Sequence, residues 1–351
     1  MARHPSDPEA ARRARIPTYA VILALLLIAA VIVFTYGLFS RNKTESIDIS
    51  PSPDANMDVN VAQVNKTTAL LPPTKVEPEP NLIEVVPVAP LGPTVEPNPD
   101  VAELITHVTA LLSGESNRII EARDRLNEVL RMPMSPQQRA FVKDQLSELA
   151  DKWLFSRTVL PGDELCGSYL VEPGDALAII GERHKVPYEI LMQINNFSRP
   201  EALQAGEKIK VINGPFHATV YRSTFTMDIY LQNTFVRSVS VGLGKPGMET
   251  PTGLWRVKRG GKLIKPIWTN PVDGRTYYPE DPDYPLGSRW IGLEGLSGAA
   301  KGRTGFAIHG TTKPEQIGTA GSQGCIRAQD GDAILLYNLL FPTFSQVEVT
   351  D

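Results

Sequence analysis

Cysteine and histidine are scarce in this chain of 351 residues, and this limits the chemistry it can perform. Its two cysteines, Cys166 and Cys325, are far apart, so the sequence offers neither a disulfide framework nor a cysteine metal cluster. Five histidines are scattered without a ligand spacing such as H-E-x-x-H, and we expect no metal and no cofactor. The net charge is -4, so no basic excess points to a nucleic-acid partner.

Charged residues are absent from positions 16–40, where the chain is almost wholly apolar. A helix that crosses a bilayer needs about 20 such residues, and this run lacks the polar stripe of a buried helix. Arginines are more frequent before the run than after it, which favours a cytoplasmic N-terminus. We therefore predict a cytoplasmic basic tail, 1–15, and a single membrane anchor, 16–40. A cleaved signal peptide is the alternative, although no clear cleavage site follows the run.

Prolines gather in one region, with eleven between Pro51 and Asp100. Because proline lacks a backbone donor and has a fixed φ, residues 41–100 are predicted to form a disordered linker. Helical patterns follow in residues 101–160, where one helix opens with Ser135 as N-cap and Pro136 in its first turn. We expect a small helical module there, with packing or spacing as its most economical role.

Residues 167–214 predict a compact strand–helix–helix–strand unit. A short strand, 169–171, is followed by a turn, a helix from Asp175 and a second helix, 188–194. A final strand is expected at 208–212. This order can bury one small core.

The same segment resembles a LysM domain. The positions that carry the resemblance are Tyr169, Val171, Gly174, Asp175, Leu177, Ile180, Val186, Leu191, Asn195, Leu203, Gly206 and Ile209. The resemblance implies binding to glycans that contain N-acetylglucosamine, such as peptidoglycan. It places the sugar at two loops, here Gly174, Asp175 and Ala176 on one side and Asn196 on the other. Ala176 departs from the usual Ser or Thr, and a unit used only for packing is the alternative.

From position 216 onward the sequence alternates between apolar and polar residues, which predicts a mainly-β domain over 216–351. One good helical pattern occurs there, at 330–340, just after Cys325. Residues 242–247 match the dinucleotide fingerprint G-x-G-x-x-G. That motif requires a following helix, and Pro246 together with the next strand pattern excludes one.

Cys325 lies in a glycine-rich segment. It follows His309 by sixteen residues, 325 minus 309. A reactive thiol needs a base and oxyanion donors, and Gly324 leaves the backbone free to turn amides toward a shared centre. His309 ends an apolar strand, which meets Cys325 if the intervening segment returns to the sheet. We expect the charge of Arg327 to favour the thiolate or to bind a carboxylate. A structural cysteine is the alternative.

These residues resemble the catalytic domain of the L,D-transpeptidases. The motifs that carry the resemblance are I-H-G-T at 308–311, S-x-G-C-I-R at 322–327, P-T-G at 251–253 and P-L-G-S-R-W at 285–290. The resemblance implies a β-sandwich in which Cys325 is the acylated nucleophile and His309 the general base, with Gly324 and Arg327 completing the catalytic signature. Ser322, Gly310 and Trp290 are then expected to contact substrate.

The sequence departs from the family pattern at two positions. Gln323 replaces a frequent histidine, so His309 must serve as the base. The segment before Pro251 lacks the first proline of P-T-P-x-G, which leaves Thr250 in doubt as a substrate contact.

The resemblance predicts a transferase that forms 3-3 cross-links between peptidoglycan stem peptides through a cysteine thioester. Its partners would be stem peptides, glycan strands and the membrane through residues 16–40, and its roles cell-wall organisation and cell shape. The expected location is the bacterial inner membrane, with the C-terminal domains in the periplasm or otherwise outside the membrane. An L,D-carboxypeptidase and a non-enzymatic wall-binding scaffold are the alternatives.

Overall fold

The computed structural model describes residues 96–113 and 118–351. The predicted tail, anchor and most of the linker lie outside these residues. Within them, no helix is both long and apolar enough to cross a membrane.

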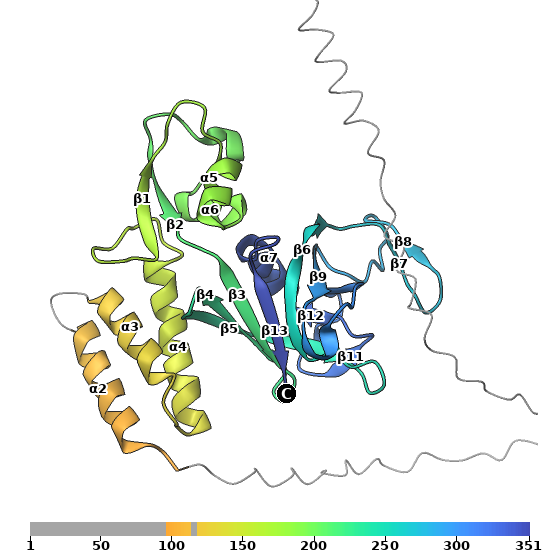
Figure 1. The fold of residues 1–351 in the computed structure, drawn as a ribbon, viewed down its shortest axis with the longest axis horizontal. Helices are drawn as coiled ribbons and strands as arrows, with labels where there is room; N and C mark the ends of the chain where they lie inside the picture. Colours follow the sequence, from red (N-terminus) through yellow and green to blue (C-terminus); the bar gives the residue numbers. More distant parts are fainter. Residues whose placement is uncertain (1–95, 114–117) are drawn as a thin grey trace, which may run out of the picture. The chain divides into compact units, whose positions relative to one another are not determined.

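Three helices form the N-terminal module of the described chain (Figure 1). They are α2 (Pro99–Ser113), α3 (Ile119–Val129) and α4 (Pro136–Trp153). The predicted start of α4 is confirmed, because the Ser135 hydroxyl accepts the Gln138 N–H and the Gln138 side chain accepts the Ser135 N–H. This reciprocal capping box satisfies two of the helix's otherwise unpaired donors.

The predicted strand–helix–helix–strand order is also confirmed, although the first strand begins earlier, at Cys166, and the first helix later, at Leu177, than predicted. It consists of β1 (Cys166–Leu170), α5 (Leu177–His184), α6 (Tyr188–Asn195) and β2 (Lys208–Ile212). β1 and β2 pair antiparallel, and the apolar sides of both helices are buried. Cys166 is buried with a free thiol.

The C-terminal domain is mainly β, as predicted. Its sheet has nine strands in the order β11-β5-β12-β10-β9-β6-β13-β3-β4. The strand bounds are β3 (Phe216–Tyr221), β4 (Thr226–Leu231), β5 (Thr234–Gly244), β6 (Gly253–Ile264), β9 (Arg289–Gly295), β10 (Phe306–His309), β11 (Ala320–Ser322), β12 (Ile326–Ala328) and β13 (Gln346–Thr350). A separate small hairpin contains β7 (Trp268–Thr269) and β8 (Thr276–Tyr277).

The large sheet closes on itself, because β4 pairs with β5 and β5 also pairs with β12. The expected β-sandwich is therefore better described as a barrel-like closed sheet. β5 ends at Gly244 and β6 begins at Gly253, so no helix follows the G-x-G-x-x-G match and the nucleotide motif is a decoy.

One helix, α7 (Asp330–Leu339), packs against β9, β10 and β12. It covers the sheet face that carries Ile291, Ile308 and Ile326, all fully or almost fully buried. Because side chains alternate along a strand, the neighbouring residues of these strands point to the opposite face. That opposite face carries the candidate catalytic residues.

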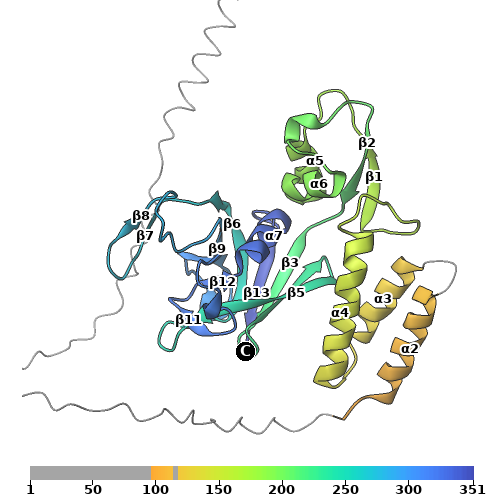
Figure 2. The same ribbon diagram turned by 180° about the vertical axis from the view of Figure 1, so that it is seen from behind.

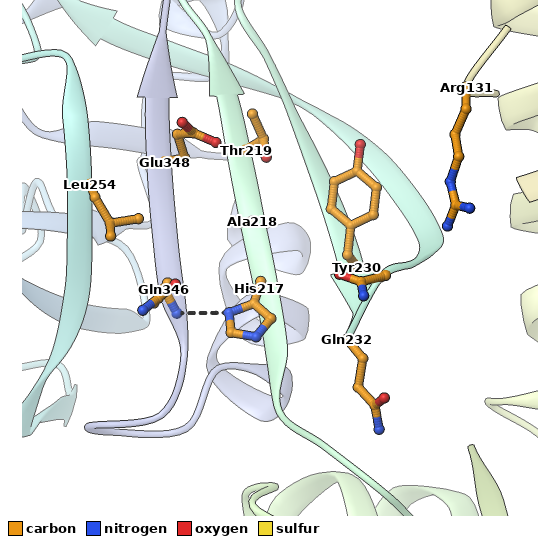
Figure 3. A pocket seen from close by; sticks show the side chains of 10 residues that line it. Arg131, His217, Ala218, Thr219, Tyr230, Gln232, Leu254, Gln346 and Glu348 are labelled. Atoms are coloured by element: carbon orange, nitrogen blue, oxygen red, sulfur yellow. Dashed lines mark hydrogen bonds between the residues drawn. The ribbon is translucent and has the colours of Figure 1, made fainter. Parts of the chain in front are cut away.

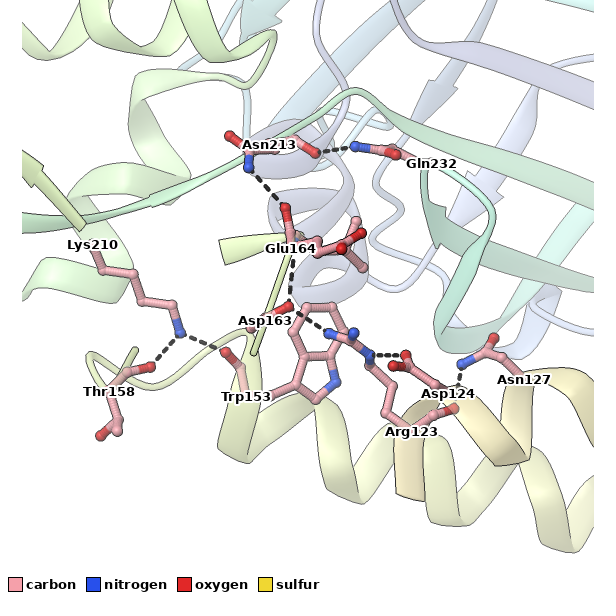
Figure 4. Close-up of polar contacts among 11 residues, drawn as sticks. Arg123, Asp124, Asn127, Trp153, Thr158, Asp163, Glu164, Lys210, Asn213 and Gln232 are labelled. Carbon is pink, nitrogen blue, oxygen red and sulfur yellow. Dashed lines mark hydrogen bonds and ion pairs between the residues drawn. The ribbon is translucent and has the colours of Figure 1, made fainter. Parts of the chain in front are cut away.

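The helical module contacts the other two parts of the described chain. α4 lies alongside β5 in both views (Figures 1 and 2), and the Lys143 Nζ of α4 is 2.6 Å from the buried Asp228 carboxylate of β4. A second junction joins α4 to β2 (Figure 4). There the Lys210 ammonium donates to the backbone carbonyls of Trp153, Ser156 and Thr158, at 2.5, 2.9 and 2.8 Å.

A buried ion pair completes the second junction. Arg123 of α3 donates to the Asp163 carboxylate at 2.7 Å, just before β1 begins (Figure 4). Asn213, which follows β2, donates to the Glu164 carbonyl and accepts from the Gln232 side chain at the β4–β5 turn. Residues from all three parts thus share one polar cluster.

Candidate active site

Parallel pairing of β10 with β12 brings the candidate histidine and cysteine to one face of the sheet. Ile308 pairs with Ile326, and His309 with Arg327. Cys325 directly precedes β12 and alternates with the buried Ile326, so it shares the face of His309. His309 and Cys325 are therefore offset by two residues across neighbouring strands. With about 5 Å between strands and about 3.3 Å per residue, their Cα atoms are roughly 8 Å apart. The predicted returning excursion between His309 and Cys325 is confirmed.

His309 is held in one tautomer and one orientation. Its Nδ1 is 2.7 Å from the Gly310 carbonyl, so Nδ1 carries the proton and donates, and Nε2 is left as the acceptor. Trp290, its pairing partner on β9, stacks on the ring with centroids 5.6 Å apart and planes inclined by 11°. The residue is only 4% exposed.

Burial lowers the pKa of His309 to about 4. The nearby charge of Arg327 also lowers this pKa, whereas the hydrogen bond to Gly310 acts against the shift. At neutral pH the imidazole is therefore uncharged, with Nε2 able to accept a proton. A neutral base is what a thiol nucleophile requires if it is to lose its proton during attack.

Cys325 lies beside an aromatic and aliphatic cluster formed by Tyr284, Leu286, Trp290 and Ala307. Its side chain is partly exposed, and Sγ is 4.0 Å from the Gly305 carbonyl. Loss of solvent raises the pKa of the thiol to about 11, against the opposing effects of a backbone hydrogen bond from Ala307 and the charge of Arg327.

The expectation that Arg327 favours the thiolate agrees with the sign of its effect on the Cys325 pKa. Desolvation is the larger effect on that pKa. The guanidinium donates to the Gln316 side chain and, at 3.4 Å, to the Gly321 carbonyl. Arg327 thus ties the segment between His309 and Cys325 back to β12.

Gly324 is required by the backbone that leads into Cys325. Its φ is +110°, a region that side-chain-bearing residues rarely adopt. A Cβ at this position would also lie 2.7 Å from Cε1 of Phe306, inside van der Waals contact. The residue before the cysteine therefore has to be glycine for steric and conformational reasons.

Two buried hydroxyls hold the Gly324 peptide from both sides. The Ser322 Oγ accepts the Gly324 N–H at 3.1 Å and donates to the Cys325 carbonyl at 2.6 Å. The Thr250 Oγ1 donates to the Gly324 carbonyl at 2.9 Å and accepts the Gly244 N–H at 3.0 Å. Thr250, which the sequence left in doubt as a substrate contact, is 3% exposed and is part of the framework that fixes the cysteine.

The candidate substrate contacts of this domain are buried or already hydrogen-bonded within the protein. Ser322 is 1% exposed with its hydroxyl engaged inside the loop, and Trp290 is 4% exposed. The Gly310 carbonyl is occupied by His309. The Gly324 amide is also engaged, since it donates to the Ser322 hydroxyl.

The LysM-like unit keeps its candidate glycan residues on loops. Gly174, Ala176 and Asn196 are exposed. The Asp175 carboxylate accepts from the Tyr169 hydroxyl at 2.7 Å and from the Glu172 N–H at 2.9 Å, and the latter bond is the main cause of its lowered pKa. Ala176 is the N-cap of α5 without a side-chain hydrogen bond, in agreement with the missing hydroxyl.

A cleft of about 490 Å³ lies elsewhere, between strands of the C-terminal domain and the end of α3 in the helical module (Figure 3). Strand residues such as His217, Thr219 and Glu348 form one wall, and Arg131 stands on the opposite wall. The cleft includes none of the candidate catalytic residues, so its volume says nothing about the chemistry at Cys325.

Comparison with known proteins agrees with this arrangement. The family model for the L,D-transpeptidase catalytic domain matches residues 215–349, and that for the LysM domain matches residues 169–211. YkuD of Bacillus subtilis, which carries the name of an L,D-transpeptidase, is 28% identical over 180 residues, covering 49% of this chain and 93% of that protein. YqjB of the same organism, similarly named, is 32% identical over 141 residues, covering 39% of this chain and 73% of that protein.

Solved structures with the same description also match. An L,D-transpeptidase from Mycobacterium tuberculosis H37Rv is 17% identical, with 42% of this chain and 64% of that chain covered and a TM-score of 0.31. The catalytic domain of the Enterococcus faecium enzyme is 21% identical, with 38% and 95% covered and a TM-score of 0.30. This chain thus spans slightly less than two-thirds of the mycobacterial structure.

The similarity to YqjB extends over 73% of that protein, and the matched family model covers the residues that include Cys325 and His309. This chain belongs to the L,D-transpeptidase family and carries a LysM domain in addition.

Proposed function

We propose that this protein is a peptidoglycan L,D-transpeptidase that forms 3-3 cross-links through a thioester on Cys325. The observation that carries the proposal is that an uncharged thiol and an uncharged, oriented imidazole lie on the same face of two neighbouring strands, in a chain of this family.

In the first half-reaction, the Cys325 thiol transfers its proton to Nε2 of His309 as sulfur attacks a carbonyl carbon. The carbonyl belongs to the L-centre of the third stem residue, diaminopimelate or lysine. A C–S bond forms, and the tetrahedral oxyanion then collapses with cleavage of the C–N bond. His309 returns the proton to the leaving amine, which departs as D-alanine.

A backbone amide is the natural donor to the oxyanion, and such a donor contributes roughly 3–4 kcal/mol. Because Ser322 takes up the Gly324 amide, the proposal assigns this role to the amide of Cys325 itself. The hydroxyls of Ser322 and Thr250 support that role, since they fix the two peptides around the cysteine.

In the second half-reaction, an amine from a neighbouring stem attacks the thioester carbonyl. His309 accepts the proton of the amine, a new C–N bond forms, and the C–S bond breaks. The sulfur leaves with the proton held by His309, which restores the neutral pair. Water in place of the amine gives the carboxypeptidase reaction.

The LysM domain supports a wall substrate, because that family is expected to bind N-acetylglucosamine-containing glycans. We further propose that residues 16–40 anchor the protein in the bacterial inner membrane and that the linker carries its folded domains into the periplasm. Fractionation of expressing cells tests this. The protein should stay with membranes after an alkaline wash, and removal of residues 1–40 should release it; recovery of the full chain in the soluble fraction would contradict the anchor.

Mass spectrometry of muropeptides tests the activity. The protein is incubated with tetrapeptide-stem monomers, and the expected products are 3-3 dimers and free D-alanine. Tripeptides without dimers would identify a carboxypeptidase. Unchanged monomers, with glycan binding retained, would identify a wall-binding scaffold.

A further inference from the structure

Three segments of the chain meet at the carboxylate of Asp330, the first residue of α7. Its Oδ1 accepts the Ser288 N–H at 2.6 Å. Glycine backbones approach the same oxygen from two sides, since a Cβ at Gly287 would lie 2.5 Å from it and a Cβ at Gly310 would lie 2.4 Å from it. The two glycines also touch each other, because a Cβ at Gly287 would lie 2.7 Å from the Gly310 Cα.

Gly310 is the residue that fixes the candidate base. Its carbonyl accepts the Nδ1 proton of His309, and its N–H donates to the Arg289 carbonyl at 3.2 Å. The Gly310 carbonyl can accept from the His309 ring only while the Gly310 peptide plane keeps its orientation. Asp330 and the Gly287 backbone pack directly against that peptide and limit how far it can rotate.

The segment held by Asp330 also leads to the aromatic ring on the other side of the histidine. Ser288, whose N–H Asp330 accepts, lies two residues before Trp290. Trp290 stacks on the His309 ring. One carboxylate therefore contacts both chain segments that determine the position of the imidazole.

We propose that Asp330 is a positioning residue, which holds His309 in its Nδ1-protonated tautomer through Gly310 and keeps Trp290 stacked on the ring. It acts through these neighbours and makes no contact with Cys325. The inference rests on the proposed function only in taking His309 as the base.

Two substitutions separate this role from a general effect on the helix. Asp330→Asn keeps an oxygen that can accept the Ser288 N–H, whereas Asp330→Ala removes it. Asp332→Ala is the matched control, because Asp332 lies in the same first turn and is also acidic, but it contacts neither glycine. All three variants are compared with wild type in the full chain.

The kinetic readout is turnover of tetrapeptide-stem muropeptides. Asp330→Ala should lower kcat by about 10- to 100-fold with KM changed less than about threefold, since a misplaced base affects the chemical step rather than binding. Asp330→Asn should retain kcat within about threefold, and Asp332→Ala should match wild type. Equal losses in the alanine variants at 330 and 332, or full activity of Asp330→Ala, would overturn the proposal.

The tautomer of His309 gives a second readout that does not require turnover. Nitrogen-15 chemical shifts of the ring, assigned by comparison with His309→Gln, should show the Nδ1-protonated form in wild type, Asp330→Asn and Asp332→Ala. Asp330→Ala should show a mixture of tautomers or the Nε2-protonated form. If Asp330→Ala keeps the wild-type shifts, the positioning role is wrong. If wild type shows the expected tautomer but leaves muropeptides unchanged, the proposed function fails and the positioning role stands.

Discussion

At the scale of single residues, the site depends on two groups that are both uncharged at rest. His309 has its pKa lowered to about 4, and Cys325 has its pKa raised to about 11, in each case chiefly by burial. In the proposed mechanism the thiolate is therefore produced when His309 takes the proton, instead of being present beforehand. This distinguishes the site from cysteine enzymes that store a thiolate–imidazolium pair.

The alkylation rate of Cys325 tests this resting state. Because the pKa of the thiol is about 11, the thiolate fraction should rise about tenfold per pH unit from pH 6 to pH 9. The rate of modification by iodoacetamide should follow that slope, measured in a Cys166→Ala background so that one thiol is followed. A rate that stays level over the same pH range would indicate a preformed thiolate and contradict the neutral pair.

Thr250 gives a second prediction at this scale. Thr250→Val keeps the shape of the side chain but removes the partner of both the Gly324 carbonyl and the Gly244 N–H. Leaving two buried polar groups unpaired should reduce stability by about 2–4 kcal/mol and lower the acylation rate at least about tenfold. Thr250→Ser keeps the hydroxyl and serves as the control. Denaturant unfolding and acylation kinetics measure both effects, and near-wild-type acylation by Thr250→Val would show that the Gly324 peptide is held by other contacts.

At the scale of elements, the C-terminus of α4 depends on a cation from β2. Lys210 is 2% exposed, and its ammonium satisfies three carbonyls at and just beyond the last turn of the helix. The negative end of the helix dipole lies at the same place, which strengthens this contact. α4 and the LysM domain are thereby joined by one side chain.

Replacing Lys210 by Met tests that junction. The substitution leaves the three carbonyls without this donor, and we expect the free energy of unfolding to fall by about 2–3 kcal/mol. Lys208→Met is the matched control, since Lys208 is exposed on the same strand and should change stability by less than about 0.5 kcal/mol. Urea titrations of both variants give the comparison. Equal changes in the free energy of unfolding at the two positions would show that the buried Lys210 ammonium does not stabilise the junction.

Local patterns in the sequence predicted elements better than they predicted contacts. The N-cap at Ser135 and the two LysM helices depend on residues close together in the chain, and the structure confirms them. Closure of the sheet depends on β5 pairing with both β4 and β12, which no short pattern encodes. The role of Thr250 depends on its bond to the carbonyl of Gly324, 74 residues away, so the residues around Thr250 in the sequence could not predict it.

At the scale of the whole described chain, the three parts are joined by buried polar contacts as well as by packing. The Asn127 side chain accepts the Phe235 N–H at 2.8 Å, which links α3 to β5. The ion pair of Lys143 with the 1%-exposed Asp228 links α4 to β4. Such contacts couple the unfolding of one part to that of its neighbours.

We therefore predict that the helical module, the LysM domain and the catalytic domain unfold together. Calorimetry of a fragment starting at residue 96 should show one transition. Lys143→Met should lower the temperature of that transition as a whole, because it leaves the Asp228 carboxylate buried without its ion-pair partner. Separate transitions for the LysM and catalytic domains would show that the junctions are too weak to couple them.

The central claim is that Cys325 forms the acyl-enzyme with His309 as its base, and intact-mass analysis of quenched reactions with peptide mapping tests it most directly. The account predicts that wild type incubated with tetrapeptide-stem muropeptide gains the mass of the acyl group on the peptide that contains Cys325. Cys325→Ala should carry no adduct and release no D-alanine, and His309→Gln should form the adduct at least about a hundredfold more slowly. An adduct on another residue, or D-alanine release by Cys325→Ala, would contradict the account.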